Sequence, residues 1–386
     1  MRLLSFFLIL LLPAAAMAQT PDDAGYRQDA LSVEQLINDN YAYLDRLPGG
    51  AYVLPDRLRA EAEAVHDRPS LLHFAERAVF VLADHHAITG SSFSDSWALV
   101  PSYSDLWIER QEGGWRITAV REGSPAANAG VQAGDVLISV NGQSTDQAVA
   151  AFWADLGVQP TPVQADFAAR VLAAGRRDRD RGLGVQSPDG PVRDLVLPSL
   201  YAVQVDRPPV ETFQSEGALV IRFNDSLGDD GAVAAFDAAM ASARPGQPVV
   251  IDLTDTASGG NTTVARASMG WFVDRPTAYQ IHNLPAEERE TGVPRQWIEQ
   301  VLPRTGRRHD GPVTVRVGRW TGSMGEGMAI GFDALGAHVQ GGPMAGLLGA
   351  VYDHRLENSG LVLKLPTERL YAVDGTPRED FTPAGD

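Results

Sequence analysis

Cysteine is absent from the chain, and lysine occurs once, as Lys364, among 386 residues. Without cysteine the chain can form no disulfide, thiol nucleophile or thiolate metal site. A mechanism that needs a lysine as proton acceptor has one candidate. Lys364 lies in the strand-like run 361–365, where we expect its ammonium group to face solvent.

Basic charge is also scarce, because 32 lysine and arginine residues stand against 49 aspartate and glutamate residues, for a net charge of −17. This balance argues against nucleic acid and anionic membranes as partners. The adjacent histidines His85 and His86 lack the i, i+4 spacing that places two imidazoles on one helix face. We therefore rank a metalloenzyme last, and we expect no metal and no cofactor.

Long hydrophobic runs are missing after the N-terminus. There, Arg2 precedes the apolar run 3–12, and small residues at Ala16 and Ala18 come before Gln19. This pattern predicts a signal peptide over residues 1–18, cleaved after Ala18. The run is too short to span a bilayer, and no later run is long enough. We expect an exported, periplasmic protein with no membrane span in the mature chain.

The remaining sequence divides into three predicted domains. Apolar residues recur near helical spacing between residues 26 and 90, which predicts an N-terminal helical domain over 19–100. Short strand patterns and a hairpin at residues 189–190 predict a β-rich domain over 101–198. From 199 to 386, strands alternate with helices, which predicts an α/β domain with a parallel or mixed sheet. The fold class is therefore multidomain α/β.

Two glycine-bearing turns follow predicted strands of the α/β domain. Ser323 lies in Thr-Gly-Ser-Met-Gly-Glu, between the strand-like run 313–317 and a Gly/Ala-rich helical segment, 328–335. A serine on such a turn can expose its hydroxyl beside helix N–H groups, which suits a nucleophile. The alternative is an ordinary helix N-cap that forms a capping box with Glu326. Gly259 and Gly260 follow the other strand, 248–253, and ligands in such sheets bind beyond the carboxyl ends of the strands.

Residues 123–142 resemble the central part of a PDZ domain, with a Ser-Pro-Ala helix start, an Ala-Gly turn, Gly-Asp and a strand ending in Asn-Gly. A PDZ domain binds an extended C-terminus as an added strand and captures its carboxylate on backbone N–H groups. Asp105 lies where the carboxylate-binding loop is expected, and its charge would repel a carboxylate. A peptide-capturing module and a purely structural or gating module are equally compatible with this segment.

The order of these motifs resembles the C-terminal processing peptidases, also called tail-specific proteases, over nearly all of the mature chain. The resemblance implies a ClpP/crotonase-like α/β core and a serine-type peptidase. It assigns Ser323 as the nucleophile and the backbone N–H groups of Gly259, Gly260 and Met324 as the oxyanion hole. Relative to the family pattern, the loop before Gly259 has one residue inserted and lacks an arginine, and Met324 replaces an alanine.

Many family members pair the serine with a lysine, but this chain has no lysine in the corresponding stretch, 343–348. Other members, including the tricorn core, use histidine and glutamate. Their Asp-x-His motif corresponds to Asp84 and His86, which favours His86 over His85. Their glutamate corresponds to Glu379 within 374–383, although the family's Gly-Val pair is absent there. The resemblance therefore implies a Ser323–His86–Glu379 triad.

The leading hypothesis is an exported serine endopeptidase that hydrolyses peptide bonds. The alternative is a catalytically inactive, peptide-binding pseudopeptidase of the same fold. The expected partner is a polypeptide, whose C-terminal segment the PDZ-like domain would bind. The sequence carries no signal for the oligomeric state.

Overall fold

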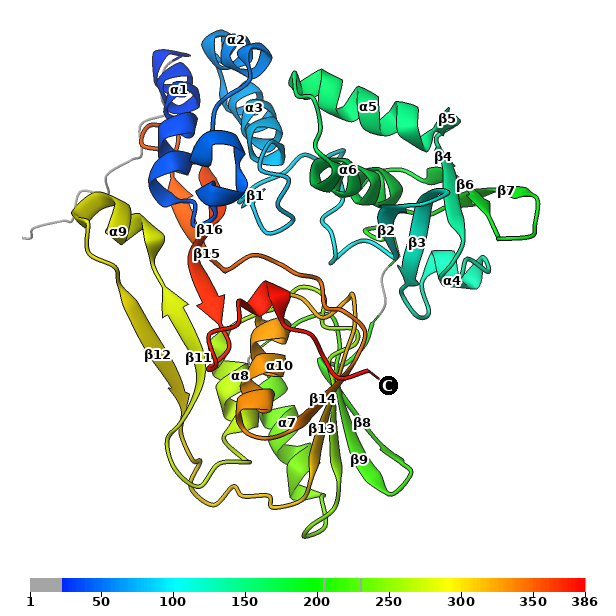
Figure 1. The fold of residues 1–386 in the computed structure, drawn as a ribbon, viewed down its shortest axis with the longest axis vertical. Coiled ribbons are helices and arrows are strands. Elements are labelled where there is room, and N and C mark those ends of the chain that lie inside the picture. The colour runs from blue at the N-terminus through cyan, green and yellow to red at the C-terminus, as the bar shows by residue number, and fades with distance from the viewer. Residues whose placement is uncertain (1–22, 204–205, 230, 386) are drawn as a thin grey trace, which may run out of the picture.

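A computed structural model of the protein describes residues 23–203, 206–229 and 231–385. The predicted signal peptide lies outside the described residues. Figure 1 shows the N-terminal helices and the β-rich domain side by side above the C-terminal α/β core. Among the described helices, none is both long and apolar enough to cross a bilayer.

The N-terminal helices pack with strands from the far end of the chain. Helices α1 (Asp23–Asn40), α2 (Asp56–Ala64) and α3 (Arg68–Phe80), with the short turns η1 (Leu44–Arg46) and η2 (Pro48–Gly50), precede β1 (Ile88–Thr89). Strand β1 pairs with β16 (Val362–Tyr371), which also pairs with β15 (Ala350–Arg355). Leu361, Leu363 and Leu365 share one apolar cluster with these helices, so both ends of the chain build this part.

The β-rich domain is an antiparallel sheet in the order β2-β3-β4-β6-β7, which leaves β2 at one edge. Its helices are α4, which starts after Ser124 as the PDZ-like pattern indicates, and α5 and α6. The elements are β2 (Leu106–Gln111), β3 (Gly114–Val120), α4 (Pro125–Asn128), β4 (Val136–Val140), β5 (Gln143–Ser144), α5 (Thr145–Leu156), α6 (Pro162–Ala174), β6 (Arg181–Gln186) and β7 (Val192–Leu197).

The core contains the predicted mixed sheet. Strand β8 (Val210–Ser215) runs antiparallel to β9 (Ala218–Phe223), and β9, β10 (Val249–Asp252), β13 (Val313–Val317) and β14 (His338–Gly341) are parallel. The remaining elements are α7 (Gly231–Ala241), α8 (Thr262–Met269), β11 (Thr277–Asn283), α9 (Pro285–Thr291), β12 (Gln296–Val301), α10 (Met324–Ala334) and η3 (Arg378–Asp380).

Helix α10 lies at the centre of the core, and its residues from Met324 to Phe332 are all buried. Small residues allow its neighbours to approach closely: a Cβ at Gly331 would lie 2.6 Å from the Met269 sulfur. A helix that is apolar on every side is expected in such a position. Its N-terminus therefore projects from a rigid base at the carboxyl ends of β10 and β13.

Candidate active site

Ser323 occupies the N-cap position of α10 in a strained backbone conformation, with φ 53° and ψ −116°. A positive φ is uncommon for a residue with a side chain, and such strain concentrates at functional sites. The turn is anchored to the end of β10, because Thr321 Oγ1 donates to the carbonyl of Leu253, the residue after that strand, at 2.7 Å. A serine on a sharp strand-to-helix turn is the geometry of a nucleophile elbow.

Glu326 holds this turn from within the core. Its buried carboxylate accepts the N–H groups of Ser323 at 2.8 Å, Gly346 at 2.8 Å and Leu347 at 3.2 Å. Burial raises the pKa of Glu326 to about 7, and the Arg378 guanidinium at 4.0 Å opposes that shift. The capping interaction predicted as the alternative to a nucleophile is thus part of the same turn. It joins the serine to the segment 346–347.

The glycine turn lies directly against the serine. A Cβ at Gly259 would lie 2.8 Å from Ser323 Oγ and 2.9 Å from the Met324 nitrogen, so only glycine fits there. Its φ is +64° and that of Gly260 is +145°. The Gly259 carbonyl accepts from the Leu227 N–H. Within the described chain, no hydrogen bond uses the N–H of Gly259, Gly260 or Met324. These groups could stabilise an oxyanion beside Ser323.

The loop before Gly259, which has one residue more than the family pattern, is held in place by ion pairs and hydrogen bonds. Arg121 and Arg207 each bind the carboxylates of both Asp225 and Asp255, at 2.6–3.2 Å. The Asp225 N–H donates to the Asp255 carbonyl at 2.7 Å, and the Ser258 N–H donates to the Asp225 carbonyl at 2.8 Å. Because Arg121 follows β3 of the PDZ-like domain, this ion-pair network ties the loop that carries Gly259 to that domain.

His86 faces the segment that Glu326 also holds. Its Nδ1 lies 2.6 Å from the Leu348 carbonyl, which can only accept, so Nδ1 carries the proton and Nε2 is left with a lone pair. The His86 N–H donates to Asp84 Oδ1 at 2.8 Å, and Tyr41 donates to Asp84 Oδ2 at 2.9 Å. Burial lowers the pKa of His86 to about 4, and the charge of Arg378 adds to this effect. The imidazole is therefore neutral at neutral pH.

His85 points into the PDZ-like domain instead. Its ring stacks on Phe167 of α6, with centroids 4.4 Å apart, and meets the edge of Trp107 of β2 at 6.4 Å. Burial lowers the pKa of His85 well below its usual range. The two histidines thus diverge, and His86 is the one that reaches the segment beside Ser323.

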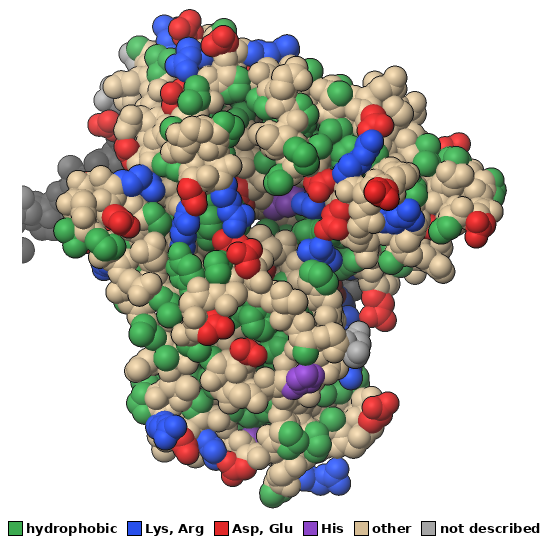
Figure 2. All heavy atoms as spheres, viewed as in Figure 1, with side chains coloured by type: hydrophobic (Ala, Val, Ile, Leu, Met, Phe, Trp, Pro, Cys, Tyr) green, Lys and Arg blue, Asp and Glu red, His purple; other side chains and the backbone are tan. Residues whose placement is uncertain are grey.

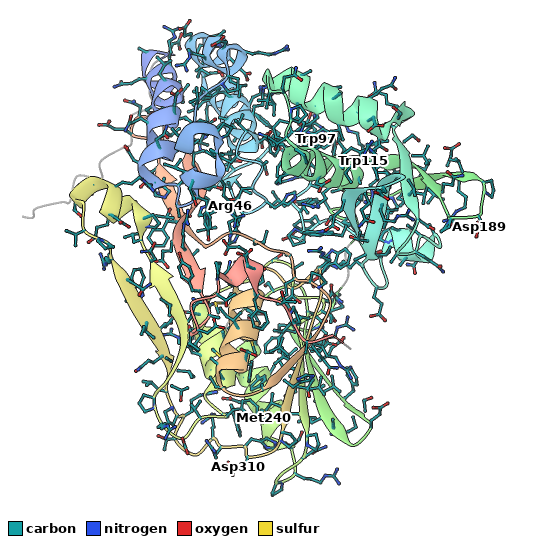
Figure 3. All side chains as sticks on the ribbon, in the orientation of Figure 1. Arg46, Trp97, Trp115, Asp189, Met240 and Asp310 are labelled. Carbon is teal, nitrogen blue, oxygen red and sulfur yellow. The ribbon has the colours of Figure 1, made fainter. Side chains whose placement is uncertain are left out.

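Glu379 binds a different partner from the one predicted. Its Oε1 accepts from Arg46 Nη2 at 3.0 Å, and its buried Oε2 has no hydrogen-bond partner among the described residues. Figure 3 labels Arg46 where the N-terminal helices meet the core. In the described part of the chain, no hydrogen bond joins His86 to Ser323 or Glu379. The carbonyl of Leu348, not Glu379, fixes the tautomer of His86 here.

Sequence reasoning missed Arg378, whose buried guanidinium donates to the carbonyls of Leu347 and Gly349 at 2.8 and 2.9 Å. It also missed Leu348, whose backbone carbonyl carries no residue-type signal. Glu326 was visible only as a helix cap. Glu326 and Arg378 together bind the segment 346–349, which contacts His86 through the Leu348 carbonyl.

Lys364 is not part of this arrangement. Its ammonium binds Asp353 at 2.6 Å, and 36% of its side-chain surface is exposed. Within the described residues, no group of three or more metal-ligating side chains could hold a metal ion.

Two clefts flank the Arg121–Asp255 ion pairs, between the PDZ-like domain and the core. One, of about 430 Å³, reaches Arg319 and Trp320 in the segment before the serine. The other, of about 450 Å³, reaches Ser258, the residue before Gly259. Figure 2 shows charged side chains of both signs around the hollow between the upper domains and the core. Ser323 lines neither cleft.

The fold has counterparts among known structures. The profile of the PDZ domain matches residues 116–151. Mature CPAF matches with a TM-score of 0.58 and 14% identity, over 94% of this chain and 92% of that one. The photosystem II D1 C-terminal processing protease matches with a TM-score of 0.56 and 15% identity, over 93% and 92% of the two chains. The chain has the fold of the C-terminal processing proteases.

This fold confirms the resemblance that the motifs indicated, together with the PDZ-like domain and the α/β core. A second structure of mature CPAF, complexed with lactacystin, matches equally well, with a TM-score of 0.58 and 14% identity over 94% of this chain and 93% of that one. No curated protein sequence matches the chain. The assignment to the Ser-His-Glu branch stays a prediction.

Proposed function

We propose that the protein is an exported serine endopeptidase whose substrate is a polypeptide and whose nucleophile is Ser323. The observation that carries the proposal is the strained turn at Ser323, packed so closely against Gly259 that a Cβ there would meet Ser323 Oγ at 2.8 Å. An ordinary helix cap needs neither the positive φ nor the glycine contact. The fold shared with mature CPAF and the D1 processing protease supports the same chemistry.

In the proposed reaction, Ser323 Oγ attacks the peptide carbonyl carbon, and His86 Nε2 takes the hydroxyl proton. The carbonyl oxygen becomes an oxyanion that the N–H groups of Gly259, Gly260 and Met324 stabilise. His86 then protonates the leaving amine as the peptide bond breaks and an acyl-enzyme forms. Water, activated by His86, hydrolyses the ester.

The role of Glu379 in this mechanism is electrostatic. Burial raises the pKa of Asp84 to about 6, and the charge of Glu379 adds a smaller contribution in the same direction, so Glu379 acts electrostatically on the turn that carries His86. The Leu348 carbonyl supplies the hydrogen bond that keeps Nε2 free to accept a proton. Glu379 completes the proposed triad as the carboxylate that favours the imidazolium.

The test is covalent labelling with a fluorophosphonate probe, which reacts with activated serines. The wild type should be labelled, and Ser323→Ala should not. Labelling of both proteins to the same extent would exclude Ser323 as the nucleophile.

A second candidate, the inactive peptide-binding pseudopeptidase, has a specific observation in its favour. Arg46 binds Glu379, and the guanidinium of Arg378 lies near His86, where it disfavours the imidazolium that catalysis requires. Casein turnover that disappears in His86→Ala would exclude this candidate. Absence of turnover in a folded wild type would favour it.

We also propose that the protein is exported to the periplasm after cleavage behind Ala18, on the pattern of its first residues. N-terminal sequencing of the mature protein should begin at Gln19. Binding of a substrate's C-terminal segment by the PDZ-like domain stays a prediction, and so does the structural alternative.

A further inference from the structure

The PDZ-like domain offers its edge strand to its own helix rather than to solvent. A PDZ domain binds a peptide by adding it as a strand to a sheet edge. Here the edge strand is β2, and α6 packs along it, between β2 and α5 (Figure 1). The position that an added strand would take is therefore filled by a helix of the same chain.

Side chains of α6 form hydrogen bonds with the β2 backbone groups that a peptide strand would otherwise bind. Alternate residues of an edge strand turn their N–H and C=O groups away from the neighbouring strand. Ile108 and Arg110 are two such positions of β2. Arg170 Nε donates to the Ile108 carbonyl at 3.0 Å, and the Arg110 N–H donates to Asp166 Oδ1 at 2.7 Å.

The loop before β2 is closed as well. Asp105 is fully buried, and both its oxygens accept from Arg181 at 2.6 Å, while Oδ2 also accepts the Ala126 N–H at 3.0 Å. The Ser104 N–H donates to the Pro101 carbonyl at 3.1 Å. The sequence suggested that Asp105 would repel an incoming carboxylate, and this prediction was wrong. The charge of Asp105 is neutralised by Arg181 inside the domain. The loop has a different task, which is to anchor α4.

Helix α6 is built into the domain. Seven of its residues are buried, and a capping box between Thr161 and Gln164 fixes its start. Trp153 of α5 donates to the Gln164 carbonyl at 2.9 Å. Removing α6 from β2 would expose Phe167 and Leu172, which belong to the main apolar cluster.

The same surfaces of α6 and β2 reach the candidate active site. Phe167 stacks on His85, the neighbour of the proposed base. Trp107 lies between the guanidinium groups of Arg170 and Arg319, at 4.6 and 4.8 Å from its ring centroid. Arg319 comes four residues before Ser323 and donates to Glu109 of β2 at 2.7 Å.

We infer that the PDZ-like domain is a fixed support for the catalytic base, with α6 filling its peptide groove, and that the enzyme therefore accepts internal polypeptide segments without recognising a free C-terminal carboxylate. The inference rests on the proposed peptidase function. It makes His85, Phe167 and Trp107 positioning residues that act through His86.

The specificity test compares matched peptide substrates that differ only in a free or an amidated C-terminus. The kcat/KM values should agree within about twofold, since α6 bonds the outer backbone groups of β2 at Ile108 and Arg110 that a peptide would use. A preference of about tenfold or more for the free acid would overturn the inference.

A binding test separates this inference from the peptidase proposal, because it does not require turnover. Ser323→Ala protein is titrated with fluorescent peptides of randomised C-terminal sequence, as free acids and as amides. Neither set should show saturable binding that depends on the carboxylate. Carboxylate-dependent binding would refute the filled groove, whether or not the wild type is a peptidase.

The positioning role is tested at His85. His85→Ala removes the stack on Phe167 and should lower kcat about ten- to a hundredfold with KM nearly unchanged, because small displacements of a catalytic group are costly. His85→Phe keeps an aromatic ring and should restore most of the activity with an unaltered pH profile. The exposed Val163→Ala on the same helix is the control. Full activity of His85→Ala, with its melting temperature unchanged, would contradict the role, and so would failure of His85→Phe to rescue.

Discussion

Around Ser323, the helix start, the Glu326 carboxylate and the Gly259 loop form one connected arrangement, whereas His86 and Glu379 each bond to a third group. The serine side is built from two turns that follow neighbouring parallel strands, β10 and β13, and sheet pairing brings such turns together. The histidine side draws on a turn after α3, the segment 346–349 and η3. The first two precede β1 and β15, which both pair with β16. That sheet is separate from the sheet of β10 and β13 among the described strands, so the approach of His86 to Ser323 depends on individual side-chain contacts.

The largest effect should come from removing the proposed base. His86→Ala should lower kcat by a factor of about 1000 or more, because triad members act as a unit. Lys364→Ala, the matched control for the lysine branch, should keep full activity, since its ammonium binds Asp353 at the surface. Steady-state kinetics on one peptide substrate decide the matter. An inactive Lys364→Ala beside an active His86→Ala would reverse the branch assignment.

The next largest loss of activity should come from substituting Gly259, which packs against Ser323. Gly259→Ala forces its Cβ to 2.4 Å from the Ser323 Cβ and should cost about 100- to 1000-fold in kcat, the loss expected for an oxyanion donor. Gly246→Ala is the control, because Gly246 also has a positive φ, +72°, but open space around it. Equal kinetics for the two variants would show that the contact with Ser323 does not matter.

The pH profile should report the environment of His86. A base must be neutral to act, and burial lowers the pKa of His86 to about 4, so activity should persist as pH falls and be lost only near pH 4. At pH 5 this leaves about thirtyfold more neutral base than an ordinary imidazole would. The acid limb of kcat/KM measures it. A limb near pH 6.5 would mean that His86 is exposed in the active enzyme or is not the base.

Glu326→Gln should weaken the link between the two sides. A glutamine of the same shape has one acceptor oxygen for three N–H groups. The free energy of unfolding of the variant should therefore fall by about 1–3 kcal/mol, and kcat should fall about tenfold. Denaturant unfolding and steady-state kinetics together provide the measurement. A variant as stable and active as the wild type would show that the three bonds are dispensable.

The smallest effect is expected at Arg46. Arg46→Met removes the cation that partly neutralises Glu379, so its carboxylate should favour a protonated His86 more strongly and raise kcat by about two- to fivefold. Arg57→Met, a similarly exposed arginine of the same domain, is the control. A fall in kcat for Arg46→Met alone would mean that Arg46 positions Glu379 productively.

Residue order alone identified the strands that end before Gly259 and Ser323, the helix that follows the serine and the PDZ-like segment. These features depend on local periodicity and on glycine at turns, so the sequence carries them directly. The family resemblance, rather than local periodicity, selected His86 over Lys364, and that choice stays a prediction. Local periodicity did not predict that residues 361–365 pack on the N-terminal helices, because an apolar residue can pack against any other apolar surface and its sequence does not specify which one.

The tertiary structure decided what the polar groups do. Asp105 reads as an exposed charge in sequence but is buried against Arg181, and Glu379 reads as the partner of His86 but binds Arg46. The bond that orients His86 comes from the carbonyl of Leu348, which any residue could supply. Residue type determines which hydrogen bonds a side chain can make, but the choice among partners is made by distance and burial, which arise only when remote segments pack together.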